Sequence, residues 1–284
     1  MIPLRKPLWL KGSVGGGPAY RDLSRRIQAQ GLHTVCDAAH CPNKGECWSR
    51  GVATLMILGD ICTRSCSFCN VHSGRPLAPD LAEPERVANA VQGMGIRYLT
   101  LTSVDRDDLE DLGAEIWAET IRRSKTVVPS LRIEALTPDF QGRTELLDAV
   151  LEAGPDVLNH NLETVPRLQR TIRKAANWKH STQILEHAHQ RGFYTKTGIM
   201  VGLGETDEEV LQFLEEMAAA RVDIVTIGQY LQPTARNTPV QRYVEPSVFQ
   251  SYAEQAHRLG IPRCESAPLV RSSWHAEDTS AGLK

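Results

Sequence analysis

Short apolar runs alternate with amphipathic stretches along this chain of 284 residues. The runs are rich in Val, Ile, Thr and Leu, and several are bounded by Gly, Pro or Asp, a composition that predicts buried β-strands. Six of them stand at Val52–Leu58, Tyr98–Thr102, Leu131–Leu136, Asp156–Asn159, Tyr194–Met200 and Asp223–Gly228.

Stretches with helical periodicity lie between these runs. Val87 and Val91 repeat at i, i+4 within Pro84–Met94. Asp207–Ala220 places several apolar residues on one face, and Thr206 with Glu209 three positions later predicts a capping box that opens this helix. Strands that alternate with helices predict a parallel sheet whose strands are joined by crossovers.

The six repeats predict an α/β fold, a partial (β/α)6 barrel, with an open doubly wound sheet as the alternative. In either fold, ligands bind at the carboxyl ends of the strands. We expect one catalytic unit over residues 1–284, in which residues 51–230 form the barrel and residues 1–50 and 231–284 are extensions.

Composition and charge narrow the choice of partners. Hydrophobic residues make up 41% of the chain and charged residues 23%, and the formal net charge is −2, so no general attraction to nucleic acid or membrane is expected. The longest apolar run, residues 52–58, is too short to cross a bilayer. The first residues are basic but carry no apolar signal-peptide core, which predicts a cytoplasmic protein.

Cysteine usage is the first chemical signal. Six of the 7 cysteines fall between Cys36 and Cys69, and an odd number without a secretion signal argues against disulfides and for metal binding. Cys62, Cys66 and Cys69 form a C-x3-C-x2-C group directly after the first predicted strand. Three thiolates on one loop can hold a four-iron cluster and leave its fourth iron open to a small molecule. A zinc site completed by His72 remains an alternative.

This group, with Phe68 as the aromatic residue before its last cysteine, resembles the signature of the radical S-adenosylmethionine superfamily. The resemblance implies a partial barrel of the radical S-adenosylmethionine type. It also implies a [4Fe–4S] cluster whose open iron binds S-adenosylmethionine, and reductive cleavage of that molecule to a 5′-deoxyadenosyl radical.

A second cysteine group lies upstream, with C-x4-C-x5-C spacing, at Cys36, Cys41 and Cys47. In this position it is similar to the lipoyl synthase family within that superfamily. Further matching segments are TSVDRDD at 102–108, LNHNLETV at 158–165, KTGIMVGLGET at 196–206 and PLVRSSWHA at 268–276.

That resemblance implies an auxiliary [4Fe–4S] cluster held by these three cysteines and by Ser273, the second serine of an RSS motif. Serine oxygen is a harder ligand than thiolate and is therefore more easily replaced. Ser272 is the competing ligand if the register differs by one, and Trp274 stands where the family usually has tyrosine.

The implied reaction is insertion of two sulfur atoms, taken from the auxiliary cluster, at C6 and C8 of an octanoyl chain on a lysine of a lipoyl carrier domain. Such carriers are the E2 subunit of 2-oxoacid dehydrogenases and the glycine cleavage H protein, and ferredoxin or flavodoxin would supply electrons. Another radical sulfur-inserting enzyme, such as biotin synthase, and a non-catalytic iron–sulfur or zinc-binding protein are the alternatives.

Polar residues after the predicted strands are candidates for binding S-adenosylmethionine. Ser103 and Asp105 follow the second strand and could meet the cationic amino group. Asn161 and Glu163 follow the fourth strand, where the glutamate could accept hydrogen bonds from the ribose hydroxyls. Lys196 on the fifth strand could face the cofactor carboxylate or pair with Glu163.

Two basic segments, residues 1–30 and 167–180, suggest docking of an acidic carrier domain by Arg170, Arg173 and Lys174, with a solvated surface as the plain alternative. Cys264, outside both cysteine groups, is expected to pack as a small hydrophobic residue.

Overall fold

The computed structural model describes residues 5–12, 16–50, 52 and 54–279. A sheet of eight strands forms its centre, in the order β1-β2-β5-β6-β7-β8-β9-β10, and β3 and β4 form a separate pair. The strands are β1 (His33–Thr34), β2 (Thr54–Ile57), β3 (Ile61–Cys62), β4 (His72–Ser73), β5 (Tyr98–Ser103), β6 (Arg132–Leu136), β7 (Val157–Asn159), β8 (Tyr194–Val201), β9 (Ile224–Gln229) and β10 (Arg263–Ser266).

All six predicted strands are present, as β2 and β5 to β9, although Ala53 of the first predicted run lies outside the described residues. They pair in parallel and in sequence order. A doubly wound sheet reverses its strand order at a switch point, whereas this order runs on from β2 to β10. The sheet curves without closing, since β1 and β10 are its two ends. The prediction of a partial barrel is therefore confirmed.

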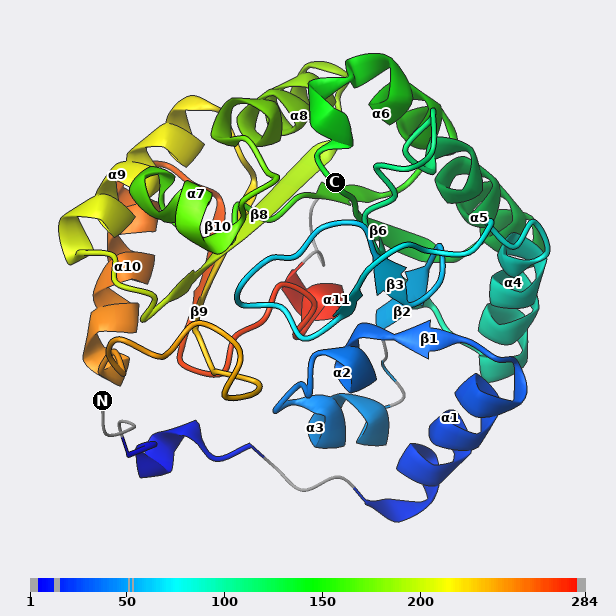
Figure 1. Ribbon diagram of the computed structural model, residues 1–284, viewed down its shortest axis with the longest axis horizontal. Coiled ribbons are helices and arrows are strands. Elements are labelled where there is room, and N and C mark those ends of the chain that lie inside the picture. Colours follow the sequence, from blue (N-terminus) through cyan, green and yellow to red (C-terminus); the bar gives the residue numbers. More distant parts are fainter. Residues whose placement is uncertain (1–4, 13–15, 51, 53, 280–284) are drawn as a thin grey trace.

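The helices of the described residues are α1 (Gly17–Ala29), α2 (Val35–Ala38), α3 (Lys44–Ser49), α4 (Glu83–Met94), α5 (Ala114–Val127), α6 (Thr144–Glu152), α7 (Gln169–Ile172), α8 (Trp178–Gln190), α9 (Asp207–Ala219), α10 (Pro246–Arg258) and α11 (Ala276–Thr279), with 3-10 turns η1 (Leu8–Leu10), η2 (Phe140–Gly142) and η3 (Pro166–Leu168). The helices α4, α5, α6, α8, α9 and α10 cover the outer face of the curved sheet, whereas α2, α3 and α11 lie across its opening (Figure 1). The predicted capping box of α9 is present: Glu209 N donates to Thr206 Oγ1 at 3.3 Å, and Thr206 N donates to Glu209 Oε2 at 2.9 Å.

Two apolar cores lie between the sheet and these helices. One packs β2, β5 and β6 against α4, α5 and α6 around the buried Trp117, and the other packs β8 and β9 against α9 and α10 around Phe213 and Phe249. No helix among the described residues is long and apolar enough to cross a membrane.

Both extensions add a strand that the sequence did not predict. β1 pairs antiparallel with β2, and β10 pairs parallel with β9. These pairings fasten the two extensions to the barrel. Cys264 lies on β10 and packs against the second core, as expected of a small apolar side chain.

The C-terminal segment after β10 lies directly against β9. A Cβ atom added to Gly228 would stand 2.1 Å from the carbonyl oxygen of Val270. The absence of a side chain at this position therefore allows residues 268–273 to approach the barrel.

We predict that Gly228→Ala lowers the free energy of unfolding of the metal-free chain by about 1–3 kcal/mol, because Val270 must move. The thermal midpoint should fall by roughly 2–10 °C, measured by circular dichroism. The control is Gly93→Ala in α4, where no atom lies within 4 Å of the added Cβ and alanine should stabilise by about 0.5–1 kcal/mol. Equal midpoints for the two variants would show that Gly228 is not constrained by this contact.

Candidate active site

A cavity of about 660 Å³ lies at the carboxyl ends of the parallel strands, and both cysteine groups contribute to its wall. Side chains from the loops after β2, β5, β6 and β7 line it, together with residues near the ends of β8 and β9 and residues 270–273 after β10. This is the location expected for a parallel β/α fold.

The loop from Cys62 to Cys69 begins at β3 and is closed by the pairing of β3 with β4. Its middle is fastened by backbone bonds: Ser67 N donates to Ile172 O at 2.9 Å, and Thr238 N donates to Ser67 O at 3.0 Å. Backbone amides also point at sulfur, since Asp105 N lies 3.3 Å from Cys62 Sγ. The loop is thus held in place by segments from three other parts of the chain.

The three thiols of this loop line the cavity and are not in disulfides. Burial raises the pKa of Cys62 and Cys66 to about 12 and that of Cys69 to about 11. Without a metal the thiols therefore keep their protons, whereas coordination to a cation favours the thiolate. Free, clustered and partly buried thiols are a donor set suited to an iron–sulfur cluster.

The upstream group lies on two short helices of the N-terminal extension. Cys36 is in α2, Cys47 is in α3, and Cys41 connects them, with its amide bonded to Cys36 O at 3.1 Å. Cys36 and Cys41 line the same cavity. Burial, followed by the proximity of Cys36 and Cys41, raises the pKa of Cys47 to about 12. The second group is therefore also a set of neighbouring free thiols.

The segment with the two serines joins this N-terminal extension to the barrel. Asn43 Nδ2 donates to Leu269 O at 2.7 Å, and Arg50 Nη2 bonds Glu277 Oε1 at 2.9 Å. Both Ser272 and Ser273 line the cavity, but Ser272 Oγ accepts a bond from Asn161 Nδ2 at 3.1 Å. That bond uses one of the two acceptor positions of the Ser272 hydroxyl.

Five of the six predicted cofactor residues line the cavity: Phe68, Ser103, Asp105, Asn161 and Glu163. Burial raises the pKa of Asp105 against the opposing charge of Arg64. Burial likewise raises the pKa of Glu163, and Arg173 opposes it. The backbone of Glu163 has a φ of 68° and is fixed by Gly198 O and Met200 N, both at 2.9 Å.

The sixth prediction, Lys196 as a cofactor ligand or a partner of Glu163, is wrong. Its Nζ lies 2.9 Å from Glu134 Oε2, and the two side chains are 1% and 0% exposed. Lys196 is near the start of β8, whereas Gly198 to Met200 further along the strand line the cavity. The neighbouring strand residue Asn159 also binds Glu134, at 2.7 Å, so this buried carboxylate holds the lysine away from the cavity.

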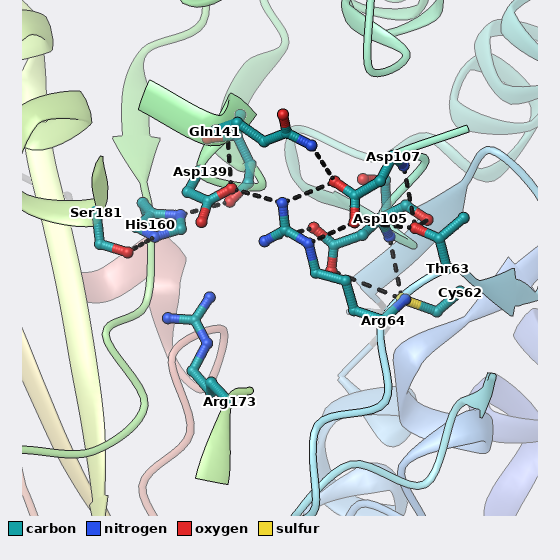
Figure 2. Close-up of polar contacts among 12 residues, drawn as sticks. Cys62, Thr63, Arg64, Asp105, Asp107, Asp139, Gln141, His160, Arg173 and Ser181 are labelled. Atoms are coloured by element: carbon teal, nitrogen blue, oxygen red, sulfur yellow. Dashed lines mark hydrogen bonds and ion pairs between the residues drawn. The ribbon is translucent and has the colours of Figure 1, made fainter. Parts of the chain in front are cut away.

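Three arginines that the sequence did not single out for the site also line the cavity: Arg64, Arg173 and Arg271. Arg64 was detectable from its place between two motif cysteines, and Arg271 from its place before the two serines. The prediction that Arg173 belongs to an exposed basic surface is wrong. It is 8% exposed and donates to Asn161 O at 2.9 Å, and Figure 2 shows it directed toward the group around His160 and Arg64.

His72, the predicted fourth ligand of a zinc site, is exposed on β4. In the described part of the chain, no three His, Cys, Asp or Glu side chains are arranged to ligate a single metal ion.

Comparison with known proteins agrees with this arrangement. The sequence profile of the radical SAM superfamily matches residues 56–217. Lipoyl synthase of Parabacteroides distasonis is 50% identical over 274 residues, which cover 96% of this chain and 98% of that protein. Lipoyl synthase of Symbiobacterium thermophilum is 50% identical, covering 98% and 87%. Mitochondrial lipoyl synthase of Nematostella vectensis is 48% identical, covering 96% and 94%.

Solved structures show the same fold at low sequence identity. SuiB of Streptococcus suis bound to S-adenosylmethionine has a TM-score of 0.61 at 10% identity, covering 76% of this chain and 52% of that chain. Methylornithine synthase has a TM-score of 0.54 at 18% identity, covering 89% and 75%.

His160 makes the stability of this site sensitive to acid. Its ring is 1% exposed, with Nδ1 at 2.8 Å from Thr137 O and Nε2 at 2.9 Å from Ser181 Oγ. Burial, assisted by Arg173, lowers its pKa to about 4. An unfolded histidine titrates near 6.5, so only the unfolded chain takes up this proton between about pH 6.5 and pH 4. Stability is therefore lost as the pH falls through that window.

We predict that His160→Gln reduces the dependence of the unfolding free energy on pH between pH 5 and 6 by roughly 1 kcal/mol per pH unit. Denaturant titrations of the metal-free chain measure both slopes. His257→Gln, at an exposed position on α10, is the matched control. Identical slopes for wild type and His160→Gln would contradict a neutral buried ring.

Proposed function

This chain belongs to the lipoyl synthase family of the radical S-adenosylmethionine superfamily, and we propose that it inserts two sulfur atoms into a protein-bound octanoyl group, at C6 and C8. The acceptor is an octanoyl chain in amide linkage to a lysine of a lipoyl carrier protein. The cofactors that we propose for this chain are [4Fe–4S] clusters and S-adenosylmethionine.

The observation that carries this proposal is the presence of two groups of three free cysteines, five of which line one cavity. A [4Fe–4S] cluster usually takes four protein ligands, so each group leaves one iron without a cysteine. We assign Cys62, Cys66 and Cys69 to the cluster that binds S-adenosylmethionine. Cys36, Cys41 and Cys47 would hold the auxiliary cluster. We prefer Ser273 to Ser272 as the fourth ligand, because the Ser272 hydroxyl is hydrogen-bonded to Asn161.

When bound, the first cluster and S-adenosylmethionine supply a radical that removes hydrogen from an unactivated carbon, and the auxiliary cluster supplies sulfur. The protein itself binds the cofactors and the substrate, orients them relative to each other, and excludes water from the site.

The polar side of the cavity is suited to a zwitterionic cofactor. The Asp105 carboxylate can bind the cationic amino group of the cofactor, and Glu163 can accept hydrogen bonds from its ribose hydroxyls. Arg173 has guanidinium hydrogens beyond its bond to Asn161 O and can bind a carboxylate, a task that the sequence suggested for Lys196. Phe68 packs with Leu203 and Tyr230 beside these groups.

The remaining wall suits an alkyl chain. Apolar side chains from four strands or the loops after them line it: Met56, Val71, Leu136, Ile199, Met200 and Leu231. An octanoyl group in contact with these residues loses water and conformational freedom, which aligns its methylene carbons with the reacting groups.

A carrier protein can approach this cavity from the side of α7. Ile172 O accepts a bond from Ser67 in the cysteine loop, so α7 adjoins the cavity wall. Arg170 and Lys174 are exposed on either side of Ile172. We propose that they attract an acidic carrier domain, such as an E2 lipoyl domain or an H protein. Ferredoxin or flavodoxin is the proposed electron donor.

The direct test of the reaction is mass spectrometry of an octanoyl-lysine peptide incubated anaerobically with the reconstituted enzyme, dithionite and S-adenosylmethionine. We predict a product that has gained two sulfur atoms. Cys41→Ala should still release 5′-deoxyadenosine but add no sulfur, whereas Cys66→Ala should lose both reactions. A wild-type enzyme that cleaves S-adenosylmethionine without adding sulfur would contradict the proposal.

Docking is tested by reversing the two exposed charges, in the double variant Arg170→Glu, Lys174→Glu. At low salt we predict that KM for an octanoylated carrier domain rises by roughly tenfold or more, because rim charges act mainly on association. KM for the octanoyl-lysine peptide should stay unchanged. Arg258→Glu, whose side chain is 70% exposed on α10, is the control. An unchanged KM for the carrier domain would exclude this surface.

A further inference from the structure

Arg64 stands between two cysteines of the loop from Cys62 to Cys69 and is only 5% exposed. Its Nε and Nη2 each donate to a different oxygen of Asp107 at 2.8 Å, and Nη2 also donates to Asp139 Oδ1 at 2.8 Å. Figure 2 shows this guanidinium at the centre of the cluster of carboxylates. The charge-assisted hydrogen bonds of Arg64 therefore go to residues outside the cysteine loop.

These bonds join three segments of the barrel. Asp107 lies after β5, which pairs with β2, and Asp139 lies after β6, which pairs with β5, so Arg64 ties the cysteine loop to the loops that follow these two strands. Further bonds support the connection: Asp107 N donates to Thr63 Oγ1 at 3.0 Å, and Gln141 Nε2 donates to Asp107 Oδ1 at 3.0 Å. Burial opposes ionisation of Asp139, but Arg64 outweighs it and lowers the pKa of that carboxyl to about 2.

The third nitrogen of the guanidinium belongs to a side chain that lines the cavity. Arg64 Nη1 is buried without a hydrogen-bond partner, and Asp105 Oδ1 lies 3.4 Å from it. The other oxygen, Asp105 Oδ2, lies 3.6 Å from Cys62 Sγ. Arg64 thus lies against the carboxylate that also contacts the first cysteine.

We propose that Arg64 is a positioning residue, which fixes the cysteine loop and the Asp105 carboxylate relative to each other before S-adenosylmethionine binds. This inference rests on the proposed function, because it concerns the site assigned to that cofactor. Asp105, Asp107 and Asp139 all face Arg64, and without its charge they repel one another and the three loops separate. The planar fork matters as well as the charge, since a lysine ammonium cannot make the bidentate bond to Asp107 while it binds Asp139.

A matched control lies nearby. Arg106 is 3% exposed and makes the same kind of bidentate pair with Asp108, at 2.8 and 2.9 Å. Its remaining bonds go to Leu77 O at 2.9 Å and Leu58 O at 3.4 Å, and it does not line the cavity. Arg106→Lys therefore removes a buried arginine fork without a link to the cysteines.

The test is equilibrium binding of labelled S-adenosylmethionine to anaerobically reconstituted holoenzyme, expressed per iron bound. We expect Arg64→Lys to weaken binding by roughly ten- to a hundredfold, which is the effect of losing one charge-assisted hydrogen bond. Arg106→Lys should remain within about twofold of wild type. Binding by Arg64→Lys within twofold of wild type, or an equal loss in both variants, would overturn the proposal.

A second variant keeps Arg64 and changes Asp139, one of the carboxylates that bind it. Asp139 is 1% exposed and does not line the cavity; its side chain accepts hydrogen bonds from Arg64 Nη2 at 2.8 Å and from Gln141 N at 3.0 Å, so Asp139→Asn reaches the cofactor site through Arg64. It should weaken binding in the same direction by about threefold or more. If Arg64→Lys fails to take up iron, Asp139→Asn decides the question, and unchanged binding by it overturns the proposal.

A third readout needs no cofactor. In the metal-free chain, Arg64→Lys should speed alkylation of Cys66 and Cys69 by iodoacetamide several-fold more than Arg106→Lys does, as measured by peptide mass spectrometry. A wild-type holoenzyme that binds no S-adenosylmethionine would contradict the proposed function rather than the role of Arg64.

Discussion

Parallel pairing of strands in sequence order is the constraint on which this site depends. It brings the carboxyl ends of β2, β5, β6, β7, β8, β9 and β10 to one edge, so that loops far apart in the sequence meet. The cysteine loop, the carboxylates after β5 and β6, and the serine segment after β10 meet there because each follows a strand of the same sheet. The close approach at Gly228 then lets the last of these segments lie against the barrel.

Around that edge, burial and charge are balanced by specific contacts. Burial raises the pKa of five of the six thiols in the two cysteine groups, those of Cys36, Cys47, Cys62, Cys66 and Cys69, which gives a bound metal cluster a large effect on their ionisation. Carboxylates in the same region are compensated by Arg64 and Arg173, whose guanidinium groups reach the cavity from a loop and from the segment after α7. The combination of anionic, cationic and apolar surface in one cavity suits a zwitterionic cofactor and an alkyl chain together.

Local patterns in the sequence predicted the parts of this arrangement that are local in origin. The six strands, the capped helix α9 and the two cysteine groups each occupy a short stretch whose residue types decide the outcome. β10 was missed because Arg263–Ser266 has no apolar pattern and becomes a strand only by pairing with β9. Lys196 was assigned wrongly because its partner, Glu134, lies 62 residues away and two strands across the sheet. Arg173 stands in a basic run, and only the tertiary fold turns it inward.

The central claim is that two incomplete sets of three thiolates hold two separate iron–sulfur clusters. Iron and sulfide analysis of the chain reconstituted without air tests it directly, with the wild type beside variants that replace Cys36, Cys41 and Cys47, or Cys62, Cys66 and Cys69, by alanine. The account predicts about eight irons per wild-type chain and about four in each triple variant. Only the variant that keeps Cys62, Cys66 and Cys69 should still bind S-adenosylmethionine. About four irons in the wild type, or stoichiometric zinc in place of iron, would contradict it.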